Sequence, residues 1–149
     1  MMILVQHILE DARRRLAVLS QAALVSDAAG ILVNPNTPLA VVCDGEGVAV
    51  GVVSRTDIIK VLASTRVDAS KMNTGAIMTN RVLSCHADHT LQRVWETMNA
   101  RSLRCVPILD NSGRPEGIVH ARDLARALLG EVTQEEVLLR DYVLGVGYQ

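Results

Sequence analysis

The 149-residue sequence predicts an α/β (α+β) protein made of two tandem repeats, and three observations support that fold class. The segment Gly51–Ile58 (GVVSRTDI) recurs as Gly117–Leu124 (GIVHARDL), at an offset of 117 − 51 = 66 residues. The same offset relates an acidic turn and a helical apolar pattern elsewhere, so the chain contains an internal duplication. Hydrophobic residues make up 49% of the chain and aromatic residues only 2%, which suits a Val, Leu, Ile and Ala core of strands packed on helices.

The elements of the first repeat follow from apolar spacing and from residues that end helices. The Ala-rich stretch 24–32 has helical spacing, and the Asn-Pro-Asn segment after it ends the helix. The apolar run 39–43 is too short for a helix and is typical of a buried strand, and the turn 44–47 leads into a hairpin. The predicted elements are a helix over 3–15, a strand over 16–20, a helix over 24–32, strands over 39–43 and 48–53, and a helix opened by Ser54.

The second repeat is predicted to follow the same order, with a strand over 82–85, a helix over 90–100, strands over 105–109 and 116–119, and a helix over 122–129. A capping-box pattern at 133–136 predicts a last helix through Leu144. A three-stranded sheet with helices on one face leaves its other face uncovered. We therefore expect the repeats to pack on each other about a pseudo-twofold axis, with two equivalent clefts between them. The predicted organisation is an N-terminal helical segment 1–15, a first repeat 16–64, a linker 65–78, a second repeat 79–130, and a C-terminal helix and tail 131–149.

The composition argues against several classes of protein. With 15 basic and 16 acidic residues the net charge is −1, without the basic excess expected of a protein that binds nucleic acid. Cys43 and Cys105 lie in apolar runs, which favours buried side chains over a catalytic thiol, and no CxxC spacing is present. The N-terminus has no basic flank and no long apolar stretch, so we expect a cytoplasmic protein without a membrane partner. We also predict no catalytic residues, no metal site and no required cofactor, since neither a nucleophile–base set nor a histidine cluster is present.

The repeated motif places an aspartate, Asp57 or Asp123, just past a short strand, where a helix begins. Ser54-x-x-Asp57 is by itself a helix capping box, and this structural interpretation would explain the first copy. In the second copy His120 is not a favoured N-cap residue, so the duplication preserves the acid rather than the cap. A functional interpretation uses the same geometry. A helix N-terminus with the hydroxyls of Ser54 and Thr56 suits a phosphate, an ionised aspartate suits a cis-diol, and an apolar wall suits a base, which together describe a nucleotide site.

The Gly-apolar-apolar-Ser/Thr-x-x-Asp pattern that closes each repeat resembles a CBS domain pair, also called a Bateman module. Further marks are the segment 76–79 (AIMT), which opens the second repeat, and 106–108 (VPI) in its middle strand. The likeness covers about residues 8–130, and the segment 139–148 is similar to the tail of small stand-alone bacterial CBS proteins. The resemblance implies a sensor of adenosine-containing ligands, namely AMP, ADP or ATP, and sometimes NAD(H) or S-adenosylmethionine.

The resemblance also implies which residues hold the ligand. In the family the aspartate contacts the ribose hydroxyls, which points to Asp57 and Asp123. His120 stands where Ser or Thr is expected, and two interpretations stay open: its imidazole donates to phosphate, more strongly when protonated, or the second site is empty. The residues expected beside the phosphate are Ser54, Thr56, His120 and Arg122, with Arg55, Lys60 and Arg126 near enough to offset its charge, and those expected around the base are Thr79, Val82, Val106, Pro107, Leu39 and Ala40.

We therefore expect a non-catalytic regulatory module that binds an adenine nucleotide and acts on an unknown effector protein through ligand-driven change in shape or association. The resemblance further implies a homodimer. The alternative is a structural dimerisation or adaptor module whose clefts bind nothing, and a small enzyme ranks last. The substitution Asp57→Ala separates the first two. The sensor would lose nucleotide binding with its fold kept, whereas the adaptor would lose only about 1 kcal/mol or less of stability, as for a weakened helix cap.

Overall fold

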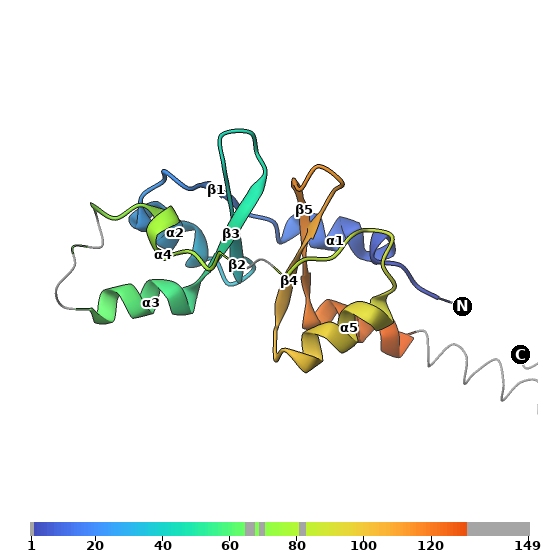
Figure 1. Ribbon diagram of the computed structural model, residues 1–149. Helices are drawn as coiled ribbons and strands as arrows, with labels where there is room; N and C mark the ends of the chain where they lie inside the picture. The colour runs from blue at the N-terminus through green and yellow to red at the C-terminus, as the bar shows by residue number, and fades with distance from the viewer. Residues whose placement is uncertain (1, 65–67, 69–70, 81–82, 131–149) are drawn as a thin grey trace, which may run out of the picture.

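The structure, a computed structural model, describes residues 2–64, 68, 71–80 and 83–130. The chain forms two halves that lie side by side, each with its own hydrophobic core (Figure 1). The predicted C-terminal helix and tail lie outside the described residues, as does Val82. No helix within the described ranges is long and apolar enough to cross a membrane.

The first half contains the three-stranded sheet that the sequence predicts. Strands β1 (Val18–Ser20) and β2 (Leu39–Cys43) run parallel, and β2 forms an antiparallel hairpin with β3 (Ala49–Ser54). Helices α2 (Val25–Leu32) and α3 (Arg55–Ala63) contact β2 and β3, respectively. The three strands and α2 begin and end within two residues of their predicted bounds, and α3 begins directly after Ser54 as predicted. Apolar runs and helix-breaking residues thus predict where these elements lie.

The second half repeats this order. Helix α5 (Leu91–Ala100) is followed by the antiparallel hairpin of β4 (Cys105–Leu109) and β5 (Pro115–His120). A further helix begins at residue 121, directly after β5, and its described part runs to residue 130. These bounds confirm the helix and the two hairpin strands that the repeat predicts.

The predicted strand over 82–85 is wrong for the residues described in it. Cys85 forms a single isolated bridge to β4, in which its N–H donates to the carbonyl of Pro107 (3.0 Å). In the first half, the N–H of Val41 donates to the carbonyl of Ala17 (2.8 Å) and so extends the ladder between β2 and the chain beside it. The residue at 41 + 66 = 107 is proline, which has no N–H to donate. Among the described residues, the second sheet therefore has two strands rather than three.

A helix that precedes the strands of each half packs on the other half. The 3-10 helix η1 (Val5–Ile8) and α1 (Leu9–Arg14) come before β1, yet α1 lies against β5 in the second half (Figure 1). Helix α4 (Thr74–Ile77) comes before the second repeat and lies against β3 in the first half. The sequence does not predict α4, since four residues are too few to show helical periodicity. Each half is thus completed by a segment that precedes the other repeat.

Two equivalent glycines permit these helix–strand contacts. A Cβ atom on Gly117 would lie 2.9 Å from Cβ of Ala12 in α1, and one on Gly51 would lie 2.6 Å from Sδ of Met78, which follows α4. The two pairs are related by the repeat, since 51 + 66 = 117 and 12 + 66 = 78. The glycine that opens the repeated motif therefore serves close approach between a strand and the segment packed on it.

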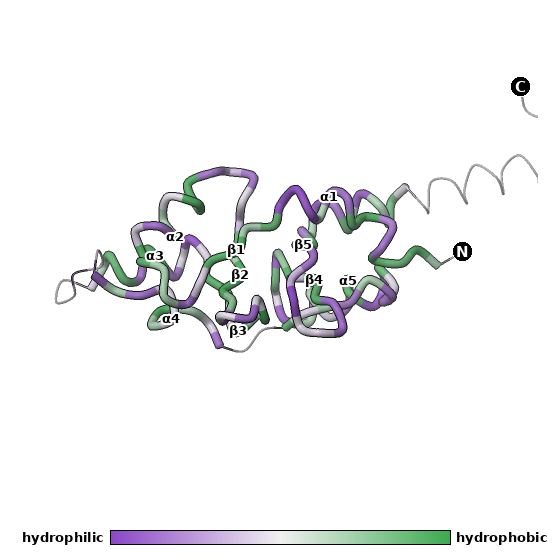
Figure 2. The backbone as a smooth tube through the Cα atoms, turned by 90° about the horizontal axis from the view of Figure 1, so that it is seen from above, coloured by the Kyte–Doolittle hydropathy of each residue, from purple (hydrophilic) through white to green (hydrophobic). Residues whose placement is uncertain are grey.

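The halves meet along their strands. Val41 and Cys43 of β2 and Ile118 of β5 form one buried apolar cluster between the two main cores. Figure 2 shows the hydrophobic strand segments in the middle of the molecule. Three pairs of helix positions related by the 66-residue offset are buried in both halves: Val25 and Leu91, Ala28 and Val94, Leu32 and Met98.

The hairpin turns make reciprocal contacts between the repeats. Gly47 lies beside Arg114, and Gly113 lies beside Val48. Since 47 + 66 = 113 and 48 + 66 = 114, each contact is the counterpart of the other. Reciprocity of this kind is what a twofold relation produces, which fits the predicted pseudo-twofold packing.

Candidate functional site

At the first strand–helix junction, β3 ends at Ser54 and α3 begins at Arg55. The Oγ of Ser54 accepts a hydrogen bond from the N–H of Asp57 (3.4 Å). In return, Oδ2 of Asp57 accepts from the N–H (2.8 Å) and from the hydroxyl (3.1 Å) of Ser54, which completes the predicted capping box. No residue that the structure describes donates to Oδ1 of Asp57, so this oxygen is available to a ligand.

At the second junction, β5 ends at His120 and the helix begins at residue 121. Nδ1 of His120 accepts from the N–H of Arg122 (3.0 Å), so the imidazole caps this helix in place of a hydroxyl. An accepting nitrogen carries no proton, and the neutral ring therefore holds its hydrogen on Nε2, from which it can donate. Burial, and next the charge of Arg15, lower the pKa of His120 below its ordinary value of 6.5. The neutral ring is therefore favoured at neutral pH over the protonated donor.

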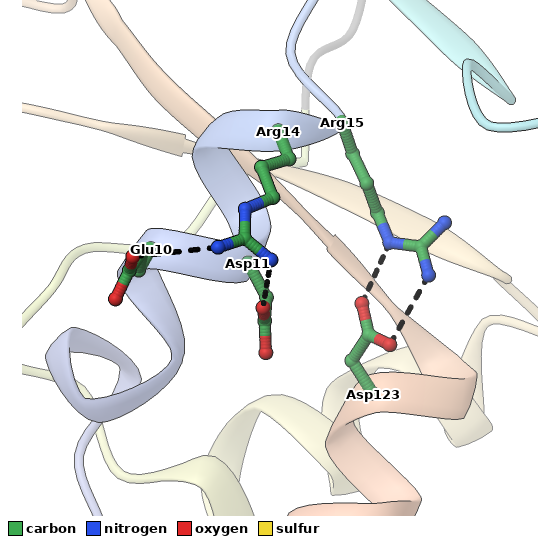
Figure 3. A network of polar contacts seen from close by, with 5 residues as sticks. All are labelled: Glu10, Asp11, Arg14, Arg15 and Asp123. Atoms are coloured by element: carbon green, nitrogen blue, oxygen red, sulfur yellow. Dashed lines mark hydrogen bonds and ion pairs between the residues drawn. The ribbon is translucent and has the colours of Figure 1, made fainter.

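Asp123, the counterpart of Asp57, turns away from its own helix cap. Nε of Arg15, which follows α1, donates to Oδ2 of Asp123 (2.6 Å), and Nη2 donates to Oδ1 (3.1 Å) (Figure 3). The side chains are only 22% and 11% exposed, unlike the neighbouring Arg14–Glu10 pair at 71% and 86%. The hydrogen bond to Asp123 raises the pKa of Arg15 above its ordinary value. Both carboxylate oxygens of Asp123 thus accept from Arg15, which precedes β1.

Both junctions open into a single cavity of about 550 Å³. Small-molecule sites in proteins have volumes of about 300–1,000 Å³, so the cavity is large enough for a nucleotide. The sequence predicts two equivalent clefts, whereas the structure joins the two junctions in one space. The predicted residues on its wall are Leu39, Ser54, Thr56, Asp57, Thr79, Pro107, His120 and Arg122.

The other predicted site residues lie elsewhere. Asp123 does not line the cavity. Ala40 and Val106 are buried in the cores of the two halves, with exposed fractions of 0% and 3%. Successive residues of a strand point to opposite faces, so their strand neighbours reach the cavity and they do not. Val82 is outside the described residues.

In the part of the chain that the structure describes, the charged residues on the wall are four arginines and one carboxylate, that of Asp57. Two of the arginines, Arg104 and Arg122, make no side-chain hydrogen bond or ion pair with any described residue. Arg15 is held by Asp123, as shown above. The unpaired guanidinium groups give the cavity a positive wall that suits a phosphate or another anion.

Arg55, the remaining arginine, serves the fold. Its Nε donates to the carbonyl of Leu32 (2.7 Å), and its Nη2 donates to the carbonyls of Asn34 (2.8 Å) and Thr37 (3.3 Å). These carbonyls lie at and after the C-terminus of α2, where the helix itself leaves acceptors unpaired. Arg55 therefore stabilises the chain where it leaves α2 at the Asn-Pro segment. The same guanidinium was predicted to lie beside a phosphate, so the two roles compete.

Sequence reasoning did not assign Arg15 or Arg104 to the site. The sequence does contain an indication for Arg15. The residues predicted to open the second repeat and line the base pocket lie within 79–82, and the 66-residue offset relates them to 13–16. Arg104 immediately precedes β4, and its counterpart before β2 is Pro38, since 38 + 66 = 104. No charge pattern marks that position, so only the packed structure could place Arg104 on the cavity wall.

Cys105 is the thiol on the cavity wall. Burial raises its pKa to about 11, and burial raises the pKa of Cys85 to about 12. A thiol of this kind is protonated at neutral pH and is a poor nucleophile. Of the two cysteines predicted to be buried, Cys43 is buried, whereas Cys105 is partly exposed on the cavity wall. In the described part of the chain, no group of three or more His, Cys, Asp or Glu side chains is arranged to hold a metal ion.

Comparison with known proteins bears on this geometry. The CBS domain model matches residues 5–64 and 75–130, which is most of the chain. The L-aspartate semialdehyde sulfurtransferase of Methanocaldococcus jannaschii is 31% identical over 107 residues, which make up 72% of this chain. The match spans 20% of that protein, so this chain corresponds to about a fifth of its length.

Solved structures share the fold. The CBS domain pair of protein MJ0100, in complex with 5′-methylthioadenosine and S-adenosyl-L-methionine, is 27% identical with a TM-score of 0.74, and the match covers 88% of this chain and 99% of that one. The CBS-domain-containing protein ATU1752 of Agrobacterium tumefaciens is also 27% identical, with a TM-score of 0.72 and coverage of 85% and 94%. The predicted α/β pair of repeats is therefore confirmed at the level of the fold.

Proposed function

Since the chain belongs to the CBS domain family, we propose that it is a non-catalytic regulatory module that binds an adenosine-containing ligand in the cavity between its repeats. The observation that carries this proposal is the shared cavity, which brings Ser54, Thr56 and Asp57 together with His120 and Arg122. These residues come from two strand–helix junctions 66 residues apart in the sequence. A purely structural duplication would not require both motifs to face one open space.

The chemistry of the wall matches the parts of a nucleotide. The Ser54 and Thr56 hydroxyls, the Nε2–H of His120 and the unpaired guanidinium groups of Arg104 and Arg122 offer hydrogen-bond donors to a phosphate. The free Oδ1 of Asp57 accepts from a ribose hydroxyl, and a group of apolar and small residues forms a surface for the base. That surface consists of Leu39, Val52, Thr79, Leu83, Leu103 and Pro107.

The ligand class also rests on a relative. The CBS domain pair of protein MJ0100 was solved with 5′-methylthioadenosine and S-adenosyl-L-methionine, both adenosine compounds. The arginine-rich wall favours an anionic member of the class, so AMP, ADP and ATP are the first ligands to test, with NAD(H) and S-adenosylmethionine after them. The nucleotide acts as a regulatory ligand here, and no cofactor is required. We expect the protein to lie in the cytoplasm and to regulate an unidentified effector protein.

A thermal-shift screen with these ligands tests the proposal. A ligand at about a hundred times its Kd stabilises the folded state by about 2.7 kcal/mol, which is a readily measured shift. Asp57→Ala should abolish the shift. Asp27→Ala is the matched control, because Asp27 occupies the same third position of its helix, α2, and is exposed away from the cavity. The control should keep the full shift.

The alternative is an adaptor module with no ligand, and the Arg15–Asp123 pair is the observation that favours it, because it fills one junction from within. The two hypotheses part in the same screen. No shift with any adenosine compound, together with a loss of about 1 kcal/mol or less for Asp57→Ala, would reject the sensor and support the adaptor.

The proposal includes a homodimer, which the exposed apolar side chains favour. Ile59 and Leu62, three residues apart on α3, are 63% and 66% exposed, and Leu129 on the helix after β5 is 65% exposed. A second copy of the chain would cover these side chains. Light scattering of Ile59→Glu with Leu62→Glu should report a monomer, whereas Val33→Glu, at a site 78% exposed after α2, should leave a dimer.

A further inference from the structure

The contact between Arg15 and Asp123 reproduces the pattern that a ligand would make. Nε and Nη2 of Arg15 are two adjacent donors that reach Oδ2 and Oδ1 of one carboxylate, at 2.6 and 3.1 Å (Figure 3). A vicinal diol offers the same pattern, with two neighbouring O–H donors to one carboxylate. The guanidinium therefore stands where the two hydroxyls of a ribose would stand at the second junction.

The cavity wall shows the same substitution. Arg15 lines the cavity, whereas Asp123 behind it does not. The carboxylate is only 11% exposed. At the first junction, by contrast, Asp57 lines the cavity itself, and no residue in the described part of the chain donates to its Oδ1. A ligand that enters the cavity thus meets an acceptor at one junction and a cation at the other.

Arg15 is not part of the repeat whose aspartate it covers. It follows α1, which precedes the first repeat and packs on β5 with Ala12 against Gly117. The position of Arg15 therefore depends on the docking of α1. Any ligand that takes Asp123 from Arg15 also removes a polar contact that holds α1 to the second half.

We propose that Arg15 is a built-in competitor for the second junction, so that a diol ligand binds at Asp57 first and binds at Asp123 only by displacing Arg15 and loosening α1. This inference rests on the proposed function. It gives the chain one high-affinity site and one site coupled to its N-terminal helix. The coupling is reciprocal: whatever draws α1 away from β5 raises the affinity of the second junction.

Calorimetric titration with AMP and with S-adenosylmethionine tests the competition. The wild-type chain should bind one molecule per chain, and Arg15→Gln should bind a second, with the affinity of the second junction raised by about 10- to 100-fold, the range that corresponds to loss of a charge-assisted contact. Arg15→Lys keeps the positive charge but loses the two adjacent donors of the guanidinium, so its affinity at the second junction should lie between those of the wild type and Arg15→Gln. It replaces the Gln variant if that variant does not fold. The control is Arg13→Gln, at an exposed arginine within α1, which should match the wild type.

The second binding event must also depend on Asp123 and involve α1. Adding Asp123→Asn to Arg15→Gln should remove it, and hydrogen exchange of the α1 amides should accelerate in the wild-type chain when ligand is raised until the second junction fills. Two equal sites in the wild type, or no second site in Arg15→Gln while Asp57-dependent binding persists, would overturn this inference alone. Absence of binding in every variant would overturn the proposed function and this inference with it.

Discussion

The two strand–helix junctions have the same backbone plan and use their aspartates in opposite ways. At the first, Asp57 turns back to Ser54 and closes a capping box within its own helix. At the second, His120 caps the helix through Nδ1, and Asp123 is released to pair with Arg15. The repeat therefore preserves the position of the acid while its partner changes.

The difference teaches how a duplicated motif can diverge. Loss of the serine hydroxyl at the second junction removes one donor to the aspartate, and the imidazole that replaces it takes only the capping role. An aspartate left without this partner in a partly buried place needs another, because an unpaired buried charge is costly. The exchange of α1 onto β5 supplies a cation at that place. Because α4 packs on β3 in the same way, the divergence at residue 120 changes the partner of the aspartate and not the exchange of segments itself.

The largest effect is expected at a pair of equivalent positions that differ in burial. Ile118 is fully buried between the halves, whereas Val52, its counterpart at 118 − 66 = 52, is partly exposed on the cavity wall. Ile118→Ala should lower the free energy of unfolding by about 2–5 kcal/mol in urea denaturation, the range for a large-to-small change in a packed core. Val52→Ala should cost clearly less. Equal losses at the two positions would contradict the asymmetric interface.

A second comparison concerns the two glycines that receive the exchanged segments. In Gly117→Ala the new Cβ would lie 2.9 Å from backbone C of Ala12, so α1 must shift. We expect a loss of about 1–3 kcal/mol, as for overpacking, and faster hydrogen exchange of the α1 amides. Gly51→Ala would instead press on Met78 and on the carbonyl of Thr79, leaving α1 protected.

The control for both is Gly45→Ala, because a Cβ on Gly45 meets no atom within 4 Å. It should change stability by about 0.5 kcal/mol or less. If Gly51→Ala accelerated exchange in α1 as much as Gly117→Ala does, the assignment of each helix to the opposite repeat would be contradicted.

The helix caps give a smaller contrast. Ser54→Ala removes the hydroxyl that accepts from the N–H of Asp57 and should cost about 1 kcal/mol of unfolding free energy. His120→Ala removes the one hydrogen bond that Nδ1 accepts from the N–H of Arg122. Its loss of unfolding free energy should be smaller, since histidine is not a favoured N-cap residue. Thermal unfolding of both variants measures the difference. A larger loss at His120 would show that the imidazole does more than cap the helix.

These contrasts also show what the sequence could and could not predict. The elements of the first half and the hairpin of the second were predictable from the sequence. The spacing of apolar residues and the turn residues are local signals, and they occur in both copies of the repeat. The short third strand predicted for the second half is wrong. Pro107 has no N–H to donate to the chain segment beside it, and that segment lies far from Pro107 in the sequence, so local patterns do not show the effect. The prediction of Ala40 and Val106 in the base pocket is wrong because side chains alternate along a strand. Of two adjacent residues, only one can face the cavity.

The partner of Asp123 was beyond local patterns for a different reason. Arg15 and Asp123 are 108 residues apart and meet only because α1 crosses to the other half. Propensity and spacing along the chain carry no information on that crossing. The 66-residue offset identifies equivalent positions, but it relates residues that resemble each other rather than residues that touch.

The smallest predicted effect is a pH dependence confined to the second junction. Burial and the charge of Arg15 hold the pKa of His120 in the folded chain below 6.5, its ordinary value in an unfolded chain. Above about pH 6.5 both states are neutral there and His120 costs no stability. As the pH falls below that value, the unfolded chain binds the proton first, so stability declines until the pH passes the folded-state pKa. His120→Gln, which cannot titrate, should flatten this part of the stability–pH curve, as measured by urea denaturation at a series of pH values. An equal slope in His120→Gln and the wild type between pH 6.5 and the onset of acid unfolding would show that the second junction accepts a proton without penalty, and with it that Arg15 does not stand beside the imidazole.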